Sequence, residues 1–260
     1  MKDELFRISG ADAGYSRNRF IRNLSFTVFH GDFVALIGPN GAGKSTILKL
    51  LAGVIKPFSG VVEFTGRDIR SCGRRELARS FSVVSRISGE MPDFPVQKFI
   101  SLGRFPFYGI LDDDENFPFE EMAARTGISH LLHRSILELS AGEFQLVQIT
   151  RALVQNSSIL LLDEPVSNLD YPHVTLIMDL LKGLNRKGTT VICALHDVNA
   201  ALDYCNRIAA VKNGNLVFDG VPDDVINAET MGMLYGSSFY CGRNPVTGRN
   251  MVLPIPGDYA

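Results

Sequence analysis

The chain has 260 residues, of which 45% are hydrophobic. This composition excludes a disordered or fibrous chain and suits one large domain, or one domain that carries a smaller insertion. Lysine and arginine together number 26 against 28 aspartate and glutamate residues, a formal net charge of −2. Such a balance gives no electrostatic reason to bind nucleic acid or an anionic membrane surface unaided, so no nucleic-acid partner is expected.

The sequence shows no segment that would cross or enter a membrane. The longest apolar stretches, such as residues 33–37 and 159–162, are far shorter than the roughly 20 residues of a spanning helix. The first residues lack the basic region and apolar run of a secretory signal, so we expect a cytosolic chain. The cysteines are widely spaced and show no metal-ligand pairing, and we interpret them as reduced structural residues: Cys72, Cys193, Cys205 and Cys241.

The first 65 residues of the chain alternate strand-like runs with turns. An apolar run over residues 32–37 leads directly into glycines, which is typical of a buried parallel strand. Residues 47–51 continue with helix-compatible spacing, so this segment predicts a strand, a glycine-rich loop and a helix. Further strands are predicted over residues 61–64 and 81–85, with a helix over residues 74–79 between them.

The pattern changes between about residues 88 and 155, where strand-like runs fade and prolines punctuate short helical pieces. This stretch predicts an inserted, mostly helical subdomain. Strands over residues 158–162 and 189–195 follow, separated by a helix over residues 173–187, and such alternation favours a parallel sheet with helices on its faces. Asn213-Gly214 then predicts a hairpin turn.

Residues 38–46 read Gly-Pro-Asn-Gly-Ala-Gly-Lys-Ser-Thr and fit the pattern of a phosphate-binding loop. The glycines let backbone N–H groups close around phosphate oxygens, and the following helix presents its positive end to the same charge. Lys44 would reach the β and γ phosphates, and the Ser45 hydroxyl would ligate Mg²⁺. A chance glycine-rich turn is the alternative, but the position between a buried strand and a helix argues against it. The candidate nucleotide-binding residues here are Gly38, Pro39, Asn40, Gly41, Ala42, Gly43, Lys44, Ser45 and Thr46.

Four apolar residues, 159–162, run directly into Asp163 and Glu164. Two carboxylates at the end of a buried strand lie where ligands of open α/β sheets gather. Asp163 is a direct or indirect partner for Mg²⁺, and Glu164 is placed to polarise a water that attacks the γ phosphate. A strand end that meets a helix cap is the alternative, and it loses weight beside the phosphate loop.

A polar turn before the helical stretch that runs to about residue 154 forms a second candidate anion site. Ser140 is a good N-cap, and Glu143 completes a Ser-x-x-Glu capping box whose exposed N–H groups could bind an anion. Taken alone, the turn is equally well a simple capped helix. The residues of this candidate site are Ser140, Ala141, Gly142 and Glu143.

In their order along the chain, the phosphate loop, Leu139–Glu143, Leu160–Pro165 and His196 resemble the nucleotide-binding subunit of ATP-binding cassette (ABC) transporters. The resemblance spans nearly the whole chain. It implies an α/β fold with a P-loop NTPase core built on a parallel sheet, an antiparallel β subdomain and an inserted helical subdomain. The chain would then be one ABC ATPase domain, with residues 1–87 and 156–260 as the nucleotide-binding core and 88–155 as the helical subdomain.

The resemblance also implies residue roles that spacing does not show. Two cassettes would stack head to tail, each ATP lying between one phosphate loop and the other subunit's Ser140–Glu143 turn. Residues 167–170 resemble the loop that links the two sites, and His196 resembles the switch histidine that contacts the γ phosphate. Tyr15 resembles the aromatic residue that stacks on adenine. By sequence alone, His196 would more often be a structural residue, and Tyr15 is equally a surface or core tyrosine.

The sequence departs from the family pattern in three places. Arg86 stands where the family usually has a glutamine that contacts Mg²⁺ and the attacking water. Either Arg86 points away, or it contacts phosphate, or the alignment of this loop is off by one residue. Ala141 replaces a commoner glycine, and residues 144–146 lack the family's arginines. These departures bear on turnover and coupling more than on nucleotide binding.

Two further segments resemble one branch of the family. Residues 96–106 are similar to a segment of cassettes that power uptake of iron-siderophores, haem and cobalamin, and the tail over residues 244–248 and 253–256 is similar to the end of the same group. Without the resemblance, the tail is only an irregular surface segment.

The resemblance implies an ATPase that uses ATP and Mg²⁺ and powers an importer for an iron chelate or a related metal-containing cofactor. Its partners would be integral membrane permease subunits, a second copy of the cassette and, indirectly, an extracytoplasmic solute-binding protein. The chain would lie on the inner face of the cell membrane and dock through residues 86–104. A non-transport cassette and a regulatory nucleotide-binding subunit with weak hydrolysis are the alternatives.

Overall fold

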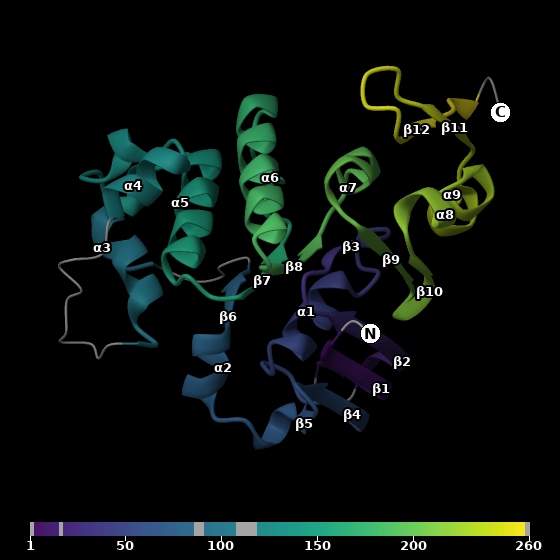
Figure 1. Cartoon of the computed structure of the whole chain (residues 1–260), viewed down its shortest axis with the longest axis horizontal. Coiled ribbons are helices and arrows are strands. Elements are labelled where there is room, and N and C mark those ends of the chain that lie inside the picture. Colours follow the sequence, from purple (N-terminus) through teal and green to yellow (C-terminus); the bar gives the residue numbers. More distant parts are fainter. Residues whose placement is uncertain (1–2, 16–17, 86–90, 108–118, 258–260) are drawn as a thin grey trace.

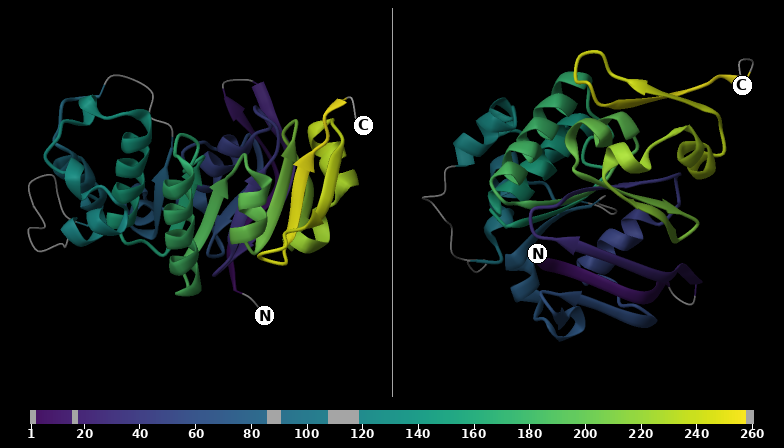
Figure 2. Two further views of the ribbon diagram at one scale, coloured as in Figure 1. Left: turned by 90° about the horizontal axis from the view of Figure 1, so that it is seen from above. Right: turned by 45° about the vertical axis from the view of Figure 1, so that its right-hand side comes forward.

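The computed structural model describes residues 3–15, 18–85, 91–107 and 119–257. Arg86, the departure from the family's glutamine, lies outside these ranges. The described elements are arranged along the long axis of the molecule, with a group of helices at one end and the chain's last hairpin toward the other (Figures 1 and 2). No helix in the described ranges is long and apolar enough to cross a membrane.

A central sheet organises the fold. Within the described residues it has six strands in the order β10-β9-β3-β8-β7-β6, all parallel except β10, which runs antiparallel to β9. The strands are β3 (Phe33–Ile37), β6 (Phe81–Val84), β7 (Ile159–Asp163), β8 (Thr190–Ala194), β9 (Arg207–Lys212) and β10 (Asn215–Gly220). Because β3, β7 and β8 run the same way, the loops that follow them emerge at one edge of the sheet.

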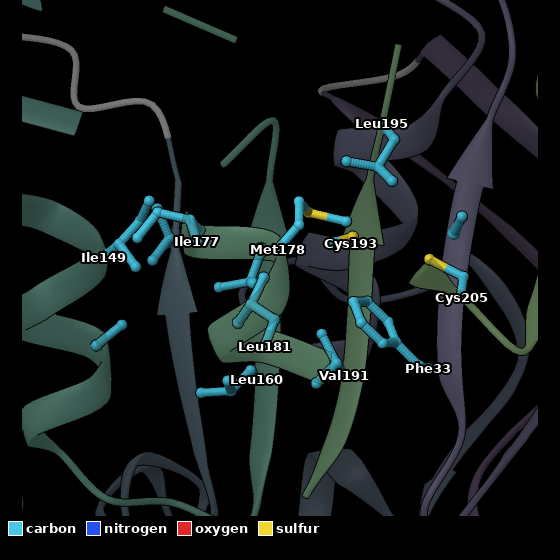
Figure 3. Close-up of a cluster of buried hydrophobic side chains, with 14 of the residues drawn as sticks. Phe33, Ile149, Leu160, Ile177, Met178, Leu181, Val191, Cys193, Leu195 and Cys205 are labelled. Atoms are coloured by element: carbon cyan, nitrogen blue, oxygen red, sulfur yellow. The ribbon is translucent and has the colours of Figure 1, made fainter. Parts of the chain in front are cut away.

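Both faces of the central strands are buried, which explains their continuous apolar runs. Phe33, Ala35 and Ile37 point to one face, and the residues between them, Val34 and Leu36, point to the other. Figure 3 shows the first face, where Phe33 and its neighbours on β8 pack beside the side chains of α6 (Tyr171–Arg186). The two faces therefore belong to two separate clusters of the described core.

The second face packs against α1 (Lys44–Leu51), and α1 in turn packs against an antiparallel sheet. Within the described residues this sheet has the order β2-β1-β4-β5, and Phe6 and Phe64 pack their rings 5.1 Å apart beneath it. Phe64 also meets Phe81 of the central sheet, with ring centroids 5.8 Å apart. The strands are β1 (Glu4–Tyr15), β2 (Asn18–Phe29), β4 (Ser59–Phe64) and β5 (Arg67–Asp68).

The stretch expected to be helical contains only helices and turns in its described part, apart from one isolated bridge between Pro95 and Ser135. Its longest helix, α5 (Ala141–Val154), buries eight residues and packs against α3 and α4. The helices of this group are α3 (Val96–Ser101), α4 (Phe119–Arg125) and α5, with short 3₁₀ turns at Leu102–Arg104, Ser129–Leu131 and Ile136–Glu138. The nearby α2 (Arg74–Ser80) precedes β6, and a 3₁₀ turn at Ile69–Ser71 precedes α2.

The tail of the chain is more regular than its composition indicates. It forms a hairpin of β11 (Phe239–Arg243) and β12 (Asn250–Pro254), preceded by α7 (Val198–Tyr204), α8 (Pro222–Val225) and α9 (Ala228–Tyr235). The Asn199 amide of α7 acts like a neighbouring strand: its Nδ2 donates to Val252 O (3.0 Å), and its Oδ1 accepts from Val252 N (2.8 Å). An isolated two-stranded hairpin is marginally stable in water, so this anchoring and the burial of Val252 support it.

One arginine ties the start of β3 to the β9–β10 hairpin. Arg207 Nη1 lies 3.0 Å from Asp32 Oδ2, and Arg207 Nε donates to Asp219 Oδ1 (2.7 Å). Asp32 is 1% exposed, and it also accepts the N–H of Phe29. Removing the guanidinium would take a cation away from a buried carboxylate.

We predict that Arg207→Ala lowers the free energy of unfolding by about 3 kcal/mol, because the buried Asp32 charge loses its compensation. Urea unfolding followed by circular dichroism measures this change. The matched control is Arg67→Ala, which breaks an exposed ion pair with Glu76 and should cost at most about 1 kcal/mol. Equal losses in the two variants would contradict a special role for the buried pair.

Candidate functional site

The phosphate-loop sequence forms the turn between β3 and α1. Its first residue, Gly38, has φ 144°, and a Cβ built on it would lie 2.0 Å from the carbonyl oxygen of Val211 on β9. Only glycine fits a backbone held this way. The packing on β9 therefore fixes where the loop starts.

The N-terminus of α1 is prepared for an anion. Gly43 is its N-cap, no side chain caps the helix, and no acidic residue lies in its first turn. The backbone amides and the helix dipole therefore present positive charge to the loop. The buried Lys44 side chain crosses the turn, and its Nζ donates to the carbonyl oxygens of Gly38 (2.7 Å) and Pro39 (3.1 Å).

A hydrogen bond joins the phosphate loop to the end of β7. Ser45 Oγ donates to Asp163 Oδ1 at 2.9 Å, although the two residues are 118 positions apart in the chain. Asp163 is only 8% exposed. A hydroxyl and a carboxylate side by side are hard oxygen ligands of the kind that Mg²⁺ uses together with substrate phosphates.

Glu164 and His196 meet at the same edge. His196 Nε2 lies 2.6 Å from Glu164 Oε1, and the glutamate is the more buried of the two. Glu164 has φ 52°, a left-handed conformation that is uncommon outside glycine. Its N–H donates to Ala194 O (3.2 Å) and its carbonyl accepts from Gln145 Nε2 (3.3 Å). Backbone in this region clusters at functional sites, where the surroundings hold it in place.

The turn at the start of α5 is a complete capping box. Ser140 Oγ accepts from Glu143 N (3.3 Å), and Glu143 Oε2 accepts from Ser140 N (2.7 Å). These bonds from Ser140 lower the pKa of the Glu143 carboxyl. Arg134 Nη1 lies 3.1 Å from Glu143 Oε1 and balances that charge. The backbone N–H groups of Ser140 and Glu143, two of those expected to bind an anion, are thus already hydrogen-bonded within the turn.

The α5 turn packs against residues 167–170, the segment between β7 and α6. A Cβ on Gly142 would lie 2.9 Å from the carbonyl oxygen of Asn168, so the glycine permits this approach. Asp170 ends the segment as the N-cap of α6, and its hydrogen bond with His173 lowers the pKa of the Asp170 carboxyl. The Ser140–Glu143 turn and residues 167–170 therefore form one continuous surface.

Tyr15 lies at the end of β1 and is 51% exposed. Its hydroxyl accepts from Lys49 Nζ (2.9 Å), and the same ammonium group lies 5.3 Å from the ring centroid. Lys49 is on α1, one turn beyond the phosphate loop. The ring is therefore accessible and held beside the helix that carries the loop.

The structure brings the residues 38–46, Asp163, Glu164 and His196 to one edge of the central sheet, at the ends of β3, β7 and β8. The hydrogen bonds of the Ser140–Glu143 turn run within itself and to Arg134. Sequence reasoning missed Lys49 and the contact that Gln145 makes with Glu164. Nothing in the local sequence marks either one.

Comparisons with known proteins find similar sequences and structures. A family model described as "ABC transporter" matches residues 21–167. The chain is 34% identical to the ferric enterobactin transport ATP-binding protein FepC of Escherichia coli (strain K12), over 98% of this chain and 96% of the relative. It is also 34% identical to the hemin import ATP-binding protein HmuV of Nocardia farcinica (strain IFM 10152), over 91% of this chain and 83% of the relative. A solved dimer of the ATP-binding cassette MJ0796 bound to ADP and Pi superposes with a TM-score of 0.75 at 26% identity, over 84% of this chain and 99% of that one.

We predict that Lys44→Ala weakens the binding of Mg-ATP at least about 100-fold, because the variant lacks the cation that would pair with the phosphates. Isothermal titration with Mg-ATP measures the affinity. Lys56→Ala, which removes an exposed lysine just beyond α1, serves as the control and should bind like the unmodified chain. Unchanged affinity in Lys44→Ala would contradict the site assignment.

Proposed function

Because the chain belongs to the ABC transporter family, we propose that it hydrolyses ATP to power the import of an iron chelate, or a related metal-containing cofactor, through a membrane permease. The observation that carries the proposal is the meeting of the phosphate loop with two carboxylates and a histidine at one sheet edge, through the Ser45–Asp163 and Glu164–His196 contacts. ATP hydrolysis is the chemistry that this combination serves in P-loop proteins.

The residues at this edge divide into binding and catalytic roles. The amides of residues 40–46 and the Lys44 ammonium group cradle the phosphates. Ser45 and Asp163 fit a Mg²⁺ ion, which when bound neutralises charge on the β and γ phosphates. Tyr15, held beside α1 by Lys49, offers an aromatic surface for the adenine.

Glu164 is the base that orients the attacking water. Its carboxylate is largely buried, and its backbone is fixed on both sides by Ala194 and Gln145, so its direction is set before the nucleotide binds. His196 now contacts Glu164 and would turn toward the γ phosphate once that group is present. When His196 exchanges Glu164 for the phosphate, the Glu164 carboxylate is released to act as the base. Phosphate binding would thus be connected to activation of Glu164.

The second half of the site comes from another copy of the chain. In this arrangement the surface formed by the Ser140–Glu143 turn and residues 167–170 faces the partner's phosphate loop. The close approach of Gly142 to Asn168 supports it, because the two segments that would meet the partner lie against each other. A relative of known structure is a dimer.

We predict that Glu164→Gln binds Mg-ATP but loses nearly all turnover, and that it forms a stable dimer in ATP because the phosphates that join the subunits persist. Phosphate release measures turnover, and size-exclusion chromatography with and without Mg-ATP measures assembly. Glu229→Gln, on the first turn of α9, is the control for a lost carboxylate. Turnover that persists in Glu164→Gln would reject its role as base, and a chain with no turnover at all would favour the regulatory alternative.

The solute class rests on the named relatives. FepC is described as a ferric enterobactin transporter subunit and HmuV as a hemin import subunit, and each covers more than nine-tenths of this chain. Both descriptions concern transport of iron held in an organic ligand. The solute itself would contact the permease and an extracytoplasmic binding protein, with this chain on the inner face of the membrane.

An exposed patch beside the helical group is the proposed permease contact. Phe105 is 50% exposed and Leu102 is also exposed, in the segment that follows α3. Arg75 and Arg79 of α2 lie alongside and donate from Nε to the Pro106 carbonyl (3.2 and 2.9 Å). An apolar pair rimmed by cations has the character of a protein interface.

We predict that Phe105→Asp leaves the ATP turnover of the isolated chain unchanged but abolishes copurification with its partner permease, because a charge replaces the apolar contact. Affinity copurification from membranes measures the complex. Tyr240→Asp changes an equally exposed aromatic residue, 55% exposed on β11, and should retain the permease. Normal copurification of Phe105→Asp would place the docking surface elsewhere.

A further inference from the structure

The turn between β9 and β10 is bonded to the phosphate loop, a contact that the proposed reaction leaves unexplained. Gly214 N donates to the carbonyl oxygen of Ala42 at 2.9 Å. Ala42 immediately precedes the N-cap of α1, at the end of the loop. At the start of the loop, the Val211 carbonyl lies against Gly38. β9 and the turn that follows it therefore hold the phosphate loop at both of its ends.

The turn itself has the backbone of a tight hairpin. Asn213 has φ 50° and Gly214 has φ 78°, and positive values at both central residues are typical of a type I′ turn. A Cβ built on Gly214 would lie 1.8 Å from the carbonyl oxygen of Phe20 on β2, so only glycine fits here. Arg22 N, also on β2, donates to Gly214 O at 3.3 Å. Gly214 is thus fastened to β2 through its carbonyl and to the phosphate loop through its N–H.

The hydrogen bond to Ala42 sets the direction of the next N–H group in the loop. The peptide bond between Ala42 and Gly43 is trans, so its C=O and N–H groups point in opposite directions. Because the carbonyl points at the β9–β10 turn, the Gly43 N–H points away from that turn. The sheet order places β9 on one side of β3, and β8 and β7 on the other. The Gly43 N–H is therefore directed away from β9, toward the side on which Asp163 ends β7.

This N–H belongs to the end of α1 that presents donors to an anion. Gly43 is the N-cap, and no side chain caps the helix. β2 supports the same peptide from behind, since a Cβ built on Gly43 would lie 2.7 Å from Ile21 Cδ1. A donor that must be ordered on binding costs conformational entropy, and a bond that fixes it beforehand removes part of that cost. The turn and β2 together supply such a fixation.

We propose that Gly214 is a positioning residue for phosphate binding: its N–H holds the Ala42 carbonyl at the β9–β10 turn and thereby aims the Gly43 N–H at the phosphates of the nucleotide. The inference rests on the proposed ATP site and adds a residue outside the phosphate-loop motif. Gly214 does not touch the nucleotide itself. Because the backbone N–H groups of such loops hold the α and β phosphates, the effect concerns Mg-ATP and Mg-ADP alike.

The sharpest test removes this one donor. Glycolic acid incorporated at Gly214 replaces the peptide N–H with an ester oxygen and adds no Cβ. We expect the affinities for Mg-ATP and Mg-ADP, measured by isothermal titration calorimetry, to fall about tenfold. The same ester at Gly66 is the matched control. Thr65 and Gly66 form a turn of the same kind between β4 and β5, with φ 47° and 75°, and no atom lies within 4 Å of a Cβ built on Gly66. This control should bind both nucleotides like the unmodified chain.

Gly214→Ala tests the same bond with a coded residue. Its methyl group would collide with the Phe20 carbonyl and displace the turn, so the affinities for both nucleotides should again fall at least about tenfold. Gly66→Ala places the same residue at a similar φ without the collision, and it should keep normal affinities even where its Tm falls. Differential scanning calorimetry measures the Tm of each variant. If Gly214→Ala does not fold, the ester at Gly214 decides the question.

The outcomes separate a positioning role from a purely structural one. A lower Tm of the Gly214 ester with unchanged affinity for both nucleotides would overturn the proposal, because the bond would then stabilise the fold alone. Equal losses of affinity in the Gly214 and Gly66 esters would overturn it as well. If the unmodified chain fails to bind Mg-ATP, the proposed nucleotide site is wrong and the inference falls with it. Binding by the unmodified chain together with normal binding by the Gly214 ester rejects the inference alone.

Discussion

The hydrogen bond between Ser45 and Asp163 is the contact on which the site depends. It joins the first turn of α1 to the end of β7 across 118 positions of sequence, at 2.9 Å. Neither residue is held there by its own segment alone. Ser45 is placed by a loop whose first glycine is pressed onto Val211, and Asp163 is placed by a strand paired on both sides. The geometry of the site is thus a consequence of the register of the parallel sheet.

The same register organises the charges. Asp163 and Glu164 end a strand with buried apolar residues on both faces, and the desolvation of two carboxylates would be costly without partners. Ser45 and His196 supply those partners. A phosphate with its metal ion would compete for both. The two pairs hold these polar side chains in place at one edge of the sheet.

The C-terminal third connects to the site more closely than its composition indicates. Asn199 pins the last hairpin to α7, and α7 begins directly after the turn that carries His196. The end of α9 reaches β9 behind the phosphate loop. A segment that reads as a surface tail is therefore fastened to two of the loops that surround the nucleotide site.

The sequence by itself determined the elements that carry chemistry. The apolar run before Gly38, the glycine spacing and the carboxylates after residue 162 identify their local structures because each depends on neighbours within a few positions. The strands at β3 and β7, the hairpin at Asn213-Gly214 and the helix after Ser140 were predicted close to where they lie. The family resemblance is confirmed by the match over residues 21–167.

Only the tertiary structure decided the rest. The left-handed backbone of Glu164, its bond from Gln145, and the approach of Gly142 to Asn168 involve partners brought together by packing. The hairpin of the tail is anchored by the two hydrogen bonds of Asn199 and by the packing of Val252 in the core. Local sequence patterns indicate which secondary structure a segment prefers. These features arise instead because the parallel sheet brings segments together that are far apart in the chain, and no short stretch of sequence encodes such contacts.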